Sequence, residues 1–390
     1  MKNKEASLTE EIVSINRRGS DSVKWALYGD EVFPLWVADT DFCSPKAVLD
    51  ALRQRVDHGV FGYPVDPPEL GELVVERMHD RYGWDIEPEH LIFVPGVVPG
   101  FNLTCQAVML EGESLLVQPP VYPPILKAAQ YAKGRSIEAQ LIRRPDGSYG
   151  VDFDGLEKMI EQDTRCFLLC NPHNPVGKVF TPDELKRMGE ICLKHNMVIC
   201  SDEIHSDLVF SESRHTPIAV LSKEIAQITV TLIAPSKTFN IAGLECAVLI
   251  CENPELKKKI QSARRGLLGG VNVLGLTAAM AAYRSGDDWL NQMLVLLEEN
   301  RNYVAEFLRS EIPQIKMKSP EATFLAWLDC RELDLPQTPY EFFLQKAGVA
   351  LNRGEDFGAG GQGYVRLNFG CSRDLLMQAL TKMAVAVKGR

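Results

Sequence analysis

Short runs of apolar residues recur along the first two thirds of the chain, and each is followed by a polar or glycine-rich stretch. Runs without charge are typical of strands that are buried on both faces of a parallel sheet. The runs are Leu91–Val94, Ser114–Val117, Cys166–Cys170, Met197–Cys200, Ile228–Ile233 and Cys246–Cys251. A capping box at Thr181-Pro182-Asp183-Glu184 predicts a helix to about Lys194 between two of them. This alternation predicts an α/β domain with a mostly parallel sheet covered by helices.

The pattern changes after about residue 285. A long charged amphipathic helix is expected from Asp287 to about Ser310, followed by half-buried strands at 323–328 and 364–369. Few strands with segregated helices indicate a second, smaller α+β domain. We therefore expect an arm and part of the small domain over 1–45, a large domain that carries the ligand site over 46–285, and the small domain over 286–390.

Composition narrows the class of protein. A chain of 390 residues exceeds the size at which one core stops growing, which also favours two domains. The net charge of -10 argues against nucleic acid or an anionic membrane as a partner. The start has no apolar core of the kind a signal peptide needs, and no stretch reaches the length of a membrane span. A cytoplasmic protein is expected.

The ten cysteines are scattered through the apolar strands rather than gathered in metal-ligand spacing. We interpret them as reduced residues of the core, and we expect no metal site.

Several residues that could form a ligand site fall just after predicted strands. They are Gly96, Tyr122, Asn171, Asn174, Asp202 and Lys237. Because an open α/β sheet binds its ligand at the carboxyl ends of the strands, these residues are expected to converge on one crevice. A lone lysine in a loop is ordinarily exposed, but one in such a crevice is desolvated. Its pKa would fall, and its amine would become nucleophilic.

Four other features have two readings each from the residues alone. The glycine turn at 95–100 precedes a helix expected from Phe101 to Met109, whose free amides could hold a phosphate. Asp39 and Asp41 either cap a helix from Pro45 or line a site. Tyr63 lies between glycines and either packs or serves a site. Arg366, inside an apolar strand, pairs either with an unseen acid or with a substrate carboxylate.

A site that combines a lysine amine, an aspartate, an aromatic ring and the start of a helix suits the cofactor pyridoxal phosphate. Six sequence motifs contain or surround these residues and carry a family resemblance: Leu35-Trp-Val-Ala-Asp-Thr-Asp-Phe42, Gly59-Val-Phe-Gly-Tyr-Pro64, Asn171-Pro-His-Asn-Pro-Val-Gly177, Ser201-Asp-Glu-Ile-His-Ser-Asp207, Ala234-Pro-Ser-Lys-Thr-Phe-Asn-Ile-Ala-Gly-Leu244 and Val365-Arg-Leu-Asn-Phe-Gly370. Over essentially its whole length the chain resembles the fold-type I pyridoxal-phosphate enzymes of the class I/II aminotransferase superfamily. Within them it is similar to the MalY/PatB-type cystathionine beta-lyases and the cystalysin-like carbon–sulfur lyases.

The resemblance implies a role for each matching residue. Lys237 would be the Schiff-base lysine, Asp202 the partner of the pyridine nitrogen, and Tyr122 the stacking ring; these three form the implied catalytic set. Further cofactor contacts are implied for Val97, Val98, Asn174, His205, Ser236 and Tyr63. Substrate contacts are implied for Arg366, Asn174, Tyr63 and Asp39. Tyr63 would serve the neighbouring subunit, which implies a homodimer with shared sites.

Two positions depart from the related aminotransferases. His205 stands where they usually carry a tyrosine, and Glu245 stands where they usually carry a phosphate-binding arginine. Both departures look like the lyase subgroup. They leave a bound phosphate with less cationic support, although the hydroxyl of Ser236 could donate to it.

The activity implied by the resemblance is α,β-elimination on a small sulfur amino acid. L-Cystathionine, a related cysteine S-conjugate, cystine or cysteine would give pyruvate, ammonia and a thiol. The alternative is an aminotransferase, because the two reactions share their first steps. A third hypothesis is an added regulatory binding role.

Overall fold

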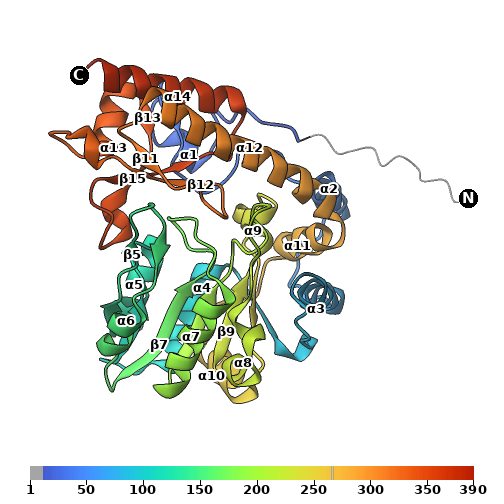
Figure 1. Cartoon of the computed structure of the whole chain (residues 1–390). Helices are drawn as coiled ribbons and strands as arrows, with labels where there is room; N and C mark the ends of the chain where they lie inside the picture. Colours follow the sequence, from blue (N-terminus) through green and yellow to red (C-terminus); the bar gives the residue numbers. More distant parts are fainter. Residues whose placement is uncertain (1–11, 265, 267) are drawn as a thin grey trace, which may run out of the picture.

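The computed structural model of the protein describes residues 12–264, 266 and 268–390. The first eleven residues of the arm expected over 1–45 therefore lie outside the described residues. Figure 1 shows two bodies, with a large sheet in the lower one and a smaller sheet under two long helices in the upper one. The chain enters near the upper body, builds the lower one, and returns to the upper body after residue 286.

The lower body is organised around a seven-stranded sheet in the order β2-β10-β9-β8-β7-β3-β4. The strands are β2 (Leu91–Val94), β3 (Ser114–Val117), β4 (Arg135–Glu138), β7 (Thr164–Cys170), β8 (Val198–Asp202), β9 (Thr229–Ile233) and β10 (Ala247–Ile250). Neighbours from β4 to β9 pair in parallel, and β10 is antiparallel to both β9 and β2. Side chains of β2, β3, β9 and β10 are buried along their whole length, as expected of strands covered on both faces.

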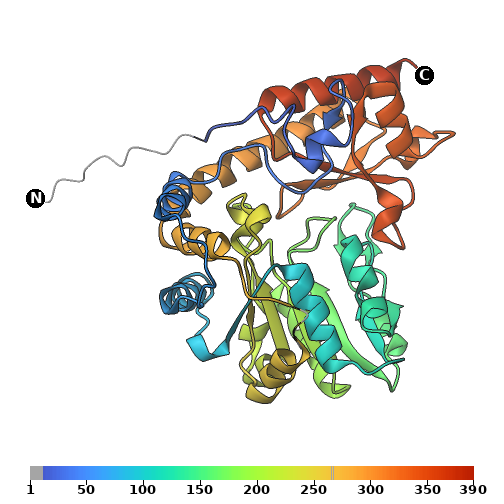
Figure 2. The same cartoon turned by 180° about the vertical axis from the view of Figure 1, so that it is seen from behind.

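Helices cover both faces of this sheet. Helices α6, α7 and α8 lie on the face seen in Figure 1, and α4, α5 and α10 lie on the face seen in Figure 2. Helices α2, α3 and α11 pack together beyond the β2 edge. The bounds are α2 (Lys46–His58), α3 (Pro68–Tyr82), α4 (Val97–Val108), α5 (Pro123–Tyr131), α6 (Phe153–Met159), α7 (Pro182–Lys194), α8 (Lys223–Gln227), α9 (Pro235–Thr238), α10 (Pro254–Ala263) and α11 (Val273–Ser285).

Helix α4 begins four residues earlier than the sequence predicted. The prediction placed a turn over 95–100 because of its prolines and glycines, whereas α4 starts at Val97. Pro99 occupies the first turn, where its missing N–H is not needed. Gly96 precedes the helix with a φ of 116°, a conformation that glycine adopts without steric cost.

The upper body is an α+β unit with a four-stranded antiparallel sheet in the order β11-β12-β15-β14. Its strands are β11 (Lys316–Met317), β12 (Leu325–Asp329), β14 (Asn352–Arg353) and β15 (Tyr364–Asn368). Helices α12 (Asp287–Glu311) and α14 (Arg373–Lys388) cover it, with the short α13 (Pro339–Phe342) beside them. A small hairpin of β5 (Ile142–Arg143) and β6 (Tyr149–Gly150) extends toward this unit from the lower body.

The amino-terminal arm joins the upper body. It contains the single turn α1 (Val23–Ala26) and the strand β1 (Phe33–Pro34), which pairs in parallel with β13 (Val349–Ala350). The backbone N–H of Asn368 in β15 donates to Leu35 O over 2.9 Å. The arm therefore delivers the segment 36–42 to the junction between the two bodies.

Nine of the ten cysteines are buried, Cys43 is partly exposed, and all ten are free thiols. In the part of the chain that the structure describes, no helix combines the length and apolar character that a membrane span needs. The same residues contain no group of three or more histidine, cysteine, aspartate or glutamate side chains arranged to hold a metal ion.

Candidate active site

A cavity of about 310 Å³ lies at the carboxyl ends of the central strands. It is built from the start of α4, the loops after β3, β7 and β8, and the turn α9 after β9. Eight of the residues that the sequence singled out line it: Val97, Val98, Tyr122, Asn174, Asp202, His205, Ser236 and Lys237. Separate loops therefore converge on one crevice as expected, except that Asn171 does not line it: its side-chain amide donates to Thr216 O and accepts from the N–H of Phe180.

Lys237 extends into the cavity from α9, the single turn that follows the buried strand β9. Its Nζ donates a hydrogen bond to the carbonyl oxygen of Ala38 over 2.6 Å. Burial, together with the positive charge of Arg366, lowers the pKa of this amine to about 8. About a tenth of Lys237 is therefore neutral and nucleophilic near pH 7, far more than of an ordinary lysine.

Asp202 is the last residue of β8, and it is buried at the wall of the cavity. Within the described residues its carboxylate accepts one hydrogen bond, from the N–H of Ile204 over 3.2 Å. Burial raises the pKa of the carboxyl to about 7. A carboxylate with so few donors is suited to a cationic N–H group in the cavity, which would restore its charge.

Arg366 does not line the cavity itself, but it is hydrogen-bonded to Asn174, which does. Nη1 of Arg366 donates to Asn174 Oδ1 over 2.9 Å, and Nη2 donates to Trp36 O and to Asn352 Oδ1. The residue is only 4% exposed, yet no carboxylate lies within salt-bridge distance of it among the described residues. Its Nε has no hydrogen-bond partner there either. A buried guanidinium without an acid has room for an anionic ligand.

Tyr122 precedes α5 on a proline-rich loop, and its ring forms part of the cavity wall. The N–H of Val121 donates to Phe357 O in the upper body over 2.9 Å. The guanidinium carbon of Arg366 lies 5.0 Å from the centre of the Phe357 ring. One phenylalanine thus contacts both the loop of Tyr122 and the side chain of Arg366.

The start of α4 forms one end of the cavity. Val97 and Val98 are its first residues, so their N–H groups have no acceptor within the helix, and Ser236 lies beside them in the lining. This is the arrangement that binds phosphate at helix N-termini. Glu245, also in the lining, places an exposed carboxylate at the position where the related aminotransferases have an arginine.

His205 lies in the lining as an uncharged imidazole. Burial, assisted by the charges of Lys237 and Arg366, lowers its pKa to about 3. Its ring meets the ring of Phe324 edge to face, with 6.1 Å between centres. Nδ1 has no hydrogen-bond partner among the residues described, so it remains open to a donor or acceptor from a ligand.

Three predicted site residues are absent from the lining of this cavity: Asp39, Tyr63 and Arg366, the last of which reaches it only through Asn174. The carboxylate of Asp39 contacts Arg17 at 3.0 Å and Lys24 at 3.6 Å, on the side of the arm. Asp41 contacts the same two cations, and helix α2 begins without a side-chain cap. Both acids therefore contact cations of the arm rather than capping α2. The charge of Asp39 also acts on Lys237, where it opposes the lowering of the pKa, and the carbonyl of the preceding residue, Ala38, accepts the hydrogen bond of that lysine.

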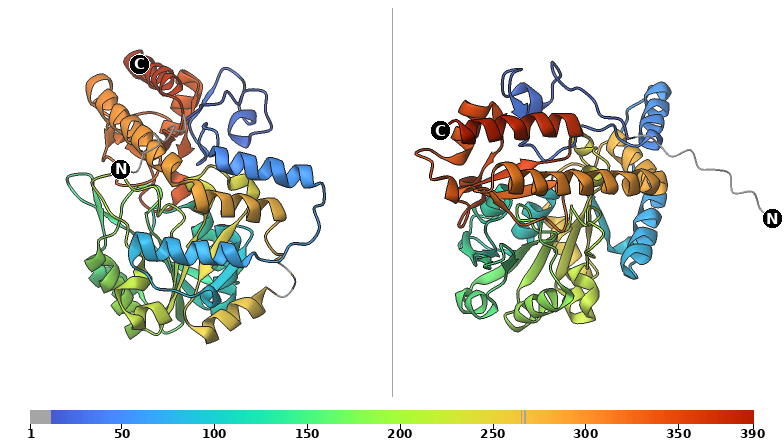
Figure 3. Two further views of the ribbon diagram at one scale, coloured as in Figure 1. Left: turned by 90° about the vertical axis from the view of Figure 1, so that its right-hand side faces the viewer. Right: turned by 45° about the horizontal axis from the view of Figure 1, so that its top comes forward.

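Tyr63 is fully exposed on the segment that loops outward between α2 and α3 (Figure 3). Its side chain does not line the cavity of its own chain.

Three contacts were not identified from the sequence. The carbonyl of Ala38 and the amide of Asn352 come from segments whose position depends on the packing of the two bodies. Cys170 lines the cavity as the last residue of β7, and its place at the end of an apolar run could have suggested it.

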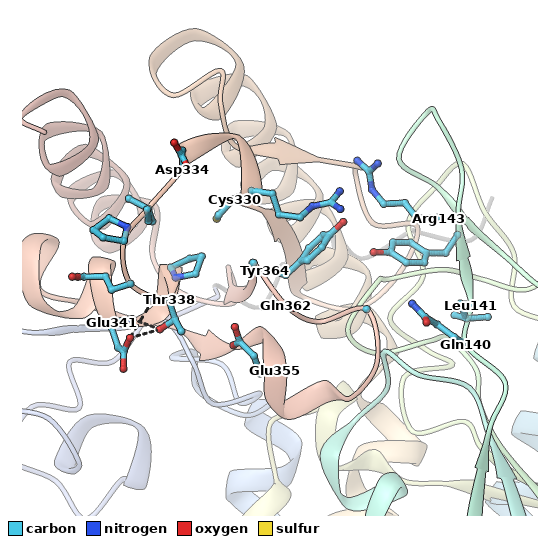
Figure 4. A pocket seen from close by; sticks show the side chains of 18 residues that line it. Gln140, Leu141, Arg143, Cys330, Asp334, Thr338, Glu341, Glu355, Gln362 and Tyr364 are labelled. Atoms are coloured by element: carbon cyan, nitrogen blue, oxygen red, sulfur yellow. Dashed lines mark hydrogen bonds between the residues drawn. The ribbon is translucent and has the colours of Figure 1, made fainter.

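A larger cavity of about 900 Å³ lies between the β5–β6 hairpin and the upper body (Figure 4). Side chains of Gln140, Leu141 and Arg143 line it from the hairpin side, and Asp334, Glu355 and Tyr364 line it from the other. It contains none of the predicted site residues, so size alone would have selected a different site.

Comparison with known proteins gives a consistent result. The chain is 40% identical to cystathionine beta-lyase PatB of Bacillus subtilis over 379 residues, which span 95% of this chain and 98% of PatB. Cystalysin from Treponema denticola, solved with pyridoxal 5'-phosphate, superimposes with a TM-score of 0.93 at 32% identity over 97% of this chain and 98% of cystalysin. A PLP-bound putative aminotransferase from Clostridium difficile also gives 0.93, at 36% identity over 96% and 98% of the two chains.

These matches confirm the predicted fold class and the resemblance seen in the motifs. The family model for aminotransferase class I and II matches residues 32–383, which is most of the chain. The protein belongs to the aminotransferase class I and II family.

Proposed function

We propose that this protein is a pyridoxal-phosphate-dependent carbon–sulfur beta-lyase. Its substrate would be L-cystathionine or a related cysteine S-conjugate, cystine or cysteine, and its products pyruvate, ammonia and a thiol. The full-length likeness to PatB, which carries the name cystathionine beta-lyase, is the observation that carries this reaction class. The cavity around Lys237 supports it independently.

The side chains present fit the cofactor. Lys237 would hold its aldehyde carbon and Asp202 its ring nitrogen, and both groups have the shifted pKa values that such partners require. Asn174 would donate to the phenolic oxygen, and Tyr122 would lie against the ring. The amides of Val97 and Val98, with the hydroxyl of Ser236, would hold the phosphate. When bound, the cofactor supplies an electron sink for the bond that breaks at the substrate Cα.

The chain's own residues would carry the substrate and the proton. Arg366 would bind the substrate carboxylate, because its buried guanidinium lacks an acidic partner. Asn174, which is bonded to Arg366, would fix the orientation of that contact. Nζ of Lys237 would take the proton from the substrate Cα and return one to the departing sulfur. A pKa near 8 suits both tasks, since the amine can accept and release a proton close to neutral pH.

The test is product analysis with L-cystathionine. We expect pyruvate and a thiol in equal amounts without any 2-oxo acid, and none from the Lys237→Ala variant. Formation of an amino acid only when 2-oxoglutarate is added would establish the aminotransferase instead. That alternative has one observation in its favour, the likeness to the putative aminotransferase from Clostridium difficile.

We further propose that the active unit is a homodimer in the cytoplasm, with each site completed by Tyr63 of the other copy. The segment that carries Tyr63 also exposes Val60, Phe61 and Val65, each more than half accessible. An exposed apolar run of this kind is typical of an interaction surface. Glu245 leaves the phosphate end short of donors, which a phenol from a second chain would supply.

The free, buried thiols favour a reducing compartment.

A further inference from the structure

A partly buried ion cluster lies outside the lining of the cavity and reaches the turn of Lys237. Asp207 contacts Arg77 Nη2 at 2.9 Å and Arg81 Nη1 at 3.3 Å, and both arginines belong to α3. Asp287, at the start of α12, contacts the same two arginines at 2.9 Å each. Two acids and two bases therefore tie α3 to the loop after β8 and to the beginning of α12.

Asp207 also reaches the catalytic turn. The hydroxyl of Thr238, the residue directly after Lys237, donates to Asp207 Oδ2 over 3.2 Å. Asp207 lies five residues after Asp202 in the same loop, and the turns in this loop are closed by backbone bonds from Ser206 to Glu203 and from Leu208 to His205. A single carboxylate thus links the loop of Asp202 to the turn of Lys237.

Arg77, which binds Asp207, is itself fixed by several contacts. Arg77 is about 5% exposed at its side chain, and its guanidinium lies 5.1 Å from the ring centre of Tyr283 and 5.8 Å from that of Phe239. Although burial alone would raise it, the pKa of Asp207 lies below its ordinary value because Arg77 and Arg81 hold the carboxyl charged. A charged acceptor fixed in this way gives the Thr238 hydroxyl one defined position.

We propose that Asp207 is a positioning residue for Lys237, which it orients through the hydroxyl of Thr238. The hydrogen bond limits rotation of α9, which is a single helical turn of four residues. The amine of Lys237 is thereby kept at the wall of the cavity, within reach of both the carbonyl of Ala38 and the substrate Cα. This inference rests on the proposed role of Lys237 as the base, and it adds the reason why that base has a fixed location.

The experiment removes only the hydroxyl. Thr238→Val keeps the volume of the side chain and all four charges of the cluster, so it avoids the unfolding that Asp207→Ala would risk. Thr238→Ser retains the hydroxyl, and Asp287→Asn weakens the same cluster without touching Thr238. Each variant is compared as holoenzyme by the pH titration of the cofactor's visible absorbance, and by kcat and KM.

For Thr238→Val we expect a shifted midpoint of the absorbance titration and a kcat lowered by about tenfold, with KM nearly unchanged, because small displacements of a catalytic group are costly. Thr238→Ser should have the titration midpoint and the kcat of the wild type, because it keeps the hydroxyl. Asp287→Asn should lower the melting temperature while leaving both values as in the wild type. The proposal would be overturned if Thr238→Val had the titration midpoint and kcat of the wild type. It would also be overturned if the valine and serine variants lost kcat to the same extent. The absorbance titration needs no substrate, so it remains decisive even if the wild type releases no pyruvate from L-cystathionine.

Discussion

The most unusual residue of the site is a lysine whose neighbours make its charge unfavourable. Lys237 is desolvated and lies near the positive charge of Arg366, and both effects lower its pKa. The pKa of Asp202 is shifted in the opposite direction, since burial raises it. Each group costs stability in the protein without cofactor, which is common where function rather than folding selects a residue.

The cost at Lys237 can be measured by substitution. Below the folded-state pKa of about 8 the amine is protonated both folded and unfolded, so burying the charge destabilises the fold. As the pH rises through about 8 toward the ordinary lysine value, the folded state releases its proton first and the cost disappears. Lys237→Met apoprotein should therefore be more stable than wild-type apoprotein at about pH 7, by roughly 2 kcal/mol after allowance for solvent in the cavity. Urea unfolding at two pH values measures this difference, and a gap that widens toward about pH 10 would contradict the assignment.

A second consequence concerns the unpaired guanidinium. Arg366→Ala should remove a desolvated, charge-assisted contact worth roughly 2–5 kcal/mol, so kcat/KM should fall by orders of magnitude. Cofactor affinity should hardly change, because the arginine contacts only the amide oxygen of Asn174, and the amide nitrogen that would donate to the cofactor is not involved. The measurements are steady-state kinetics and a cofactor titration. Loss of the cofactor or of the fold would instead give Arg366 a structural role.

At the scale of elements, the position of α4 depends on the absence of one side chain. A Cβ at Gly100 would lie 2.5 Å from Leu232 in β9 and 3.1 Å from Leu249 in β10. The helix can therefore approach the sheet closely, and its amino-terminal amides reach the cavity. Packing of the middle of the helix and phosphate binding at its start are thus properties of one rigid element.

Gly100→Val should force α4 away from the sheet. Overpacking of this kind costs about 1–3 kcal/mol of stability, and the displaced amides of Val97 and Val98 should weaken cofactor binding. Thermal unfolding and a fluorescence titration with pyridoxal phosphate measure the two effects. Gln106→Ala, on the exposed face of the same helix, serves as the control. Full cofactor affinity in a destabilised Gly100→Val would separate the packing of the helix from its binding role.

The elements of the large sheet could be predicted because buried parallel strands are apolar throughout and end at polar loops. Leu91–Val94 and Ser114–Val117 have the expected bounds. The antiparallel direction of β10 could not be predicted, since a strand that is apolar along its whole length reads the same in either direction. The partners of Asp39 were missed for another reason: they come from the arm, whose position is set by tertiary packing rather than by local pattern.

At the scale of the molecule, the exposed segment between α2 and α3 is followed directly by the helix that carries Arg77 and Arg81. A contact made by this segment with a second copy would therefore reach the cluster below Lys237 through one helix. A two-fold arrangement necessarily creates two equivalent sites, each with residues from both chains.

Mixing two inactive variants tests this arrangement. Lys237→Ala and Tyr63→Phe should each have little activity as homodimers. If sites are shared, a hybrid dimer has one site with both defects and one with neither, so activity should return on subunit exchange. The measurement is pyruvate release before and after mixing, with exchange verified by differently tagged chains. No recovery in verified hybrids would place Tyr63 in the service of its own chain.

The distribution of the cysteines gives a further expectation for the whole molecule. Burial raises the pKa of Cys246 to about 12 and that of Cys251 to about 11, and Cys43 alone is partly exposed. A chromogenic disulfide reagent should therefore modify one thiol per native chain and all ten after denaturation. Rapid modification of several thiols in the native protein would contradict this.

The burial of the cysteines also affects how readily such an enzyme forms mixed disulfides with its substrates and products. A lyase that releases thiols from sulfur amino acids works among reactive sulfur compounds, and cystine is itself a disulfide. Exchange between a protein thiol and a disulfide requires an accessible thiolate. Cys43 is the partly exposed thiol, so mixed disulfides with sulfur compounds in solution would form there. Cys170 lines the cavity, but burial raises the pKa of its thiol, which keeps it protonated and slow to exchange.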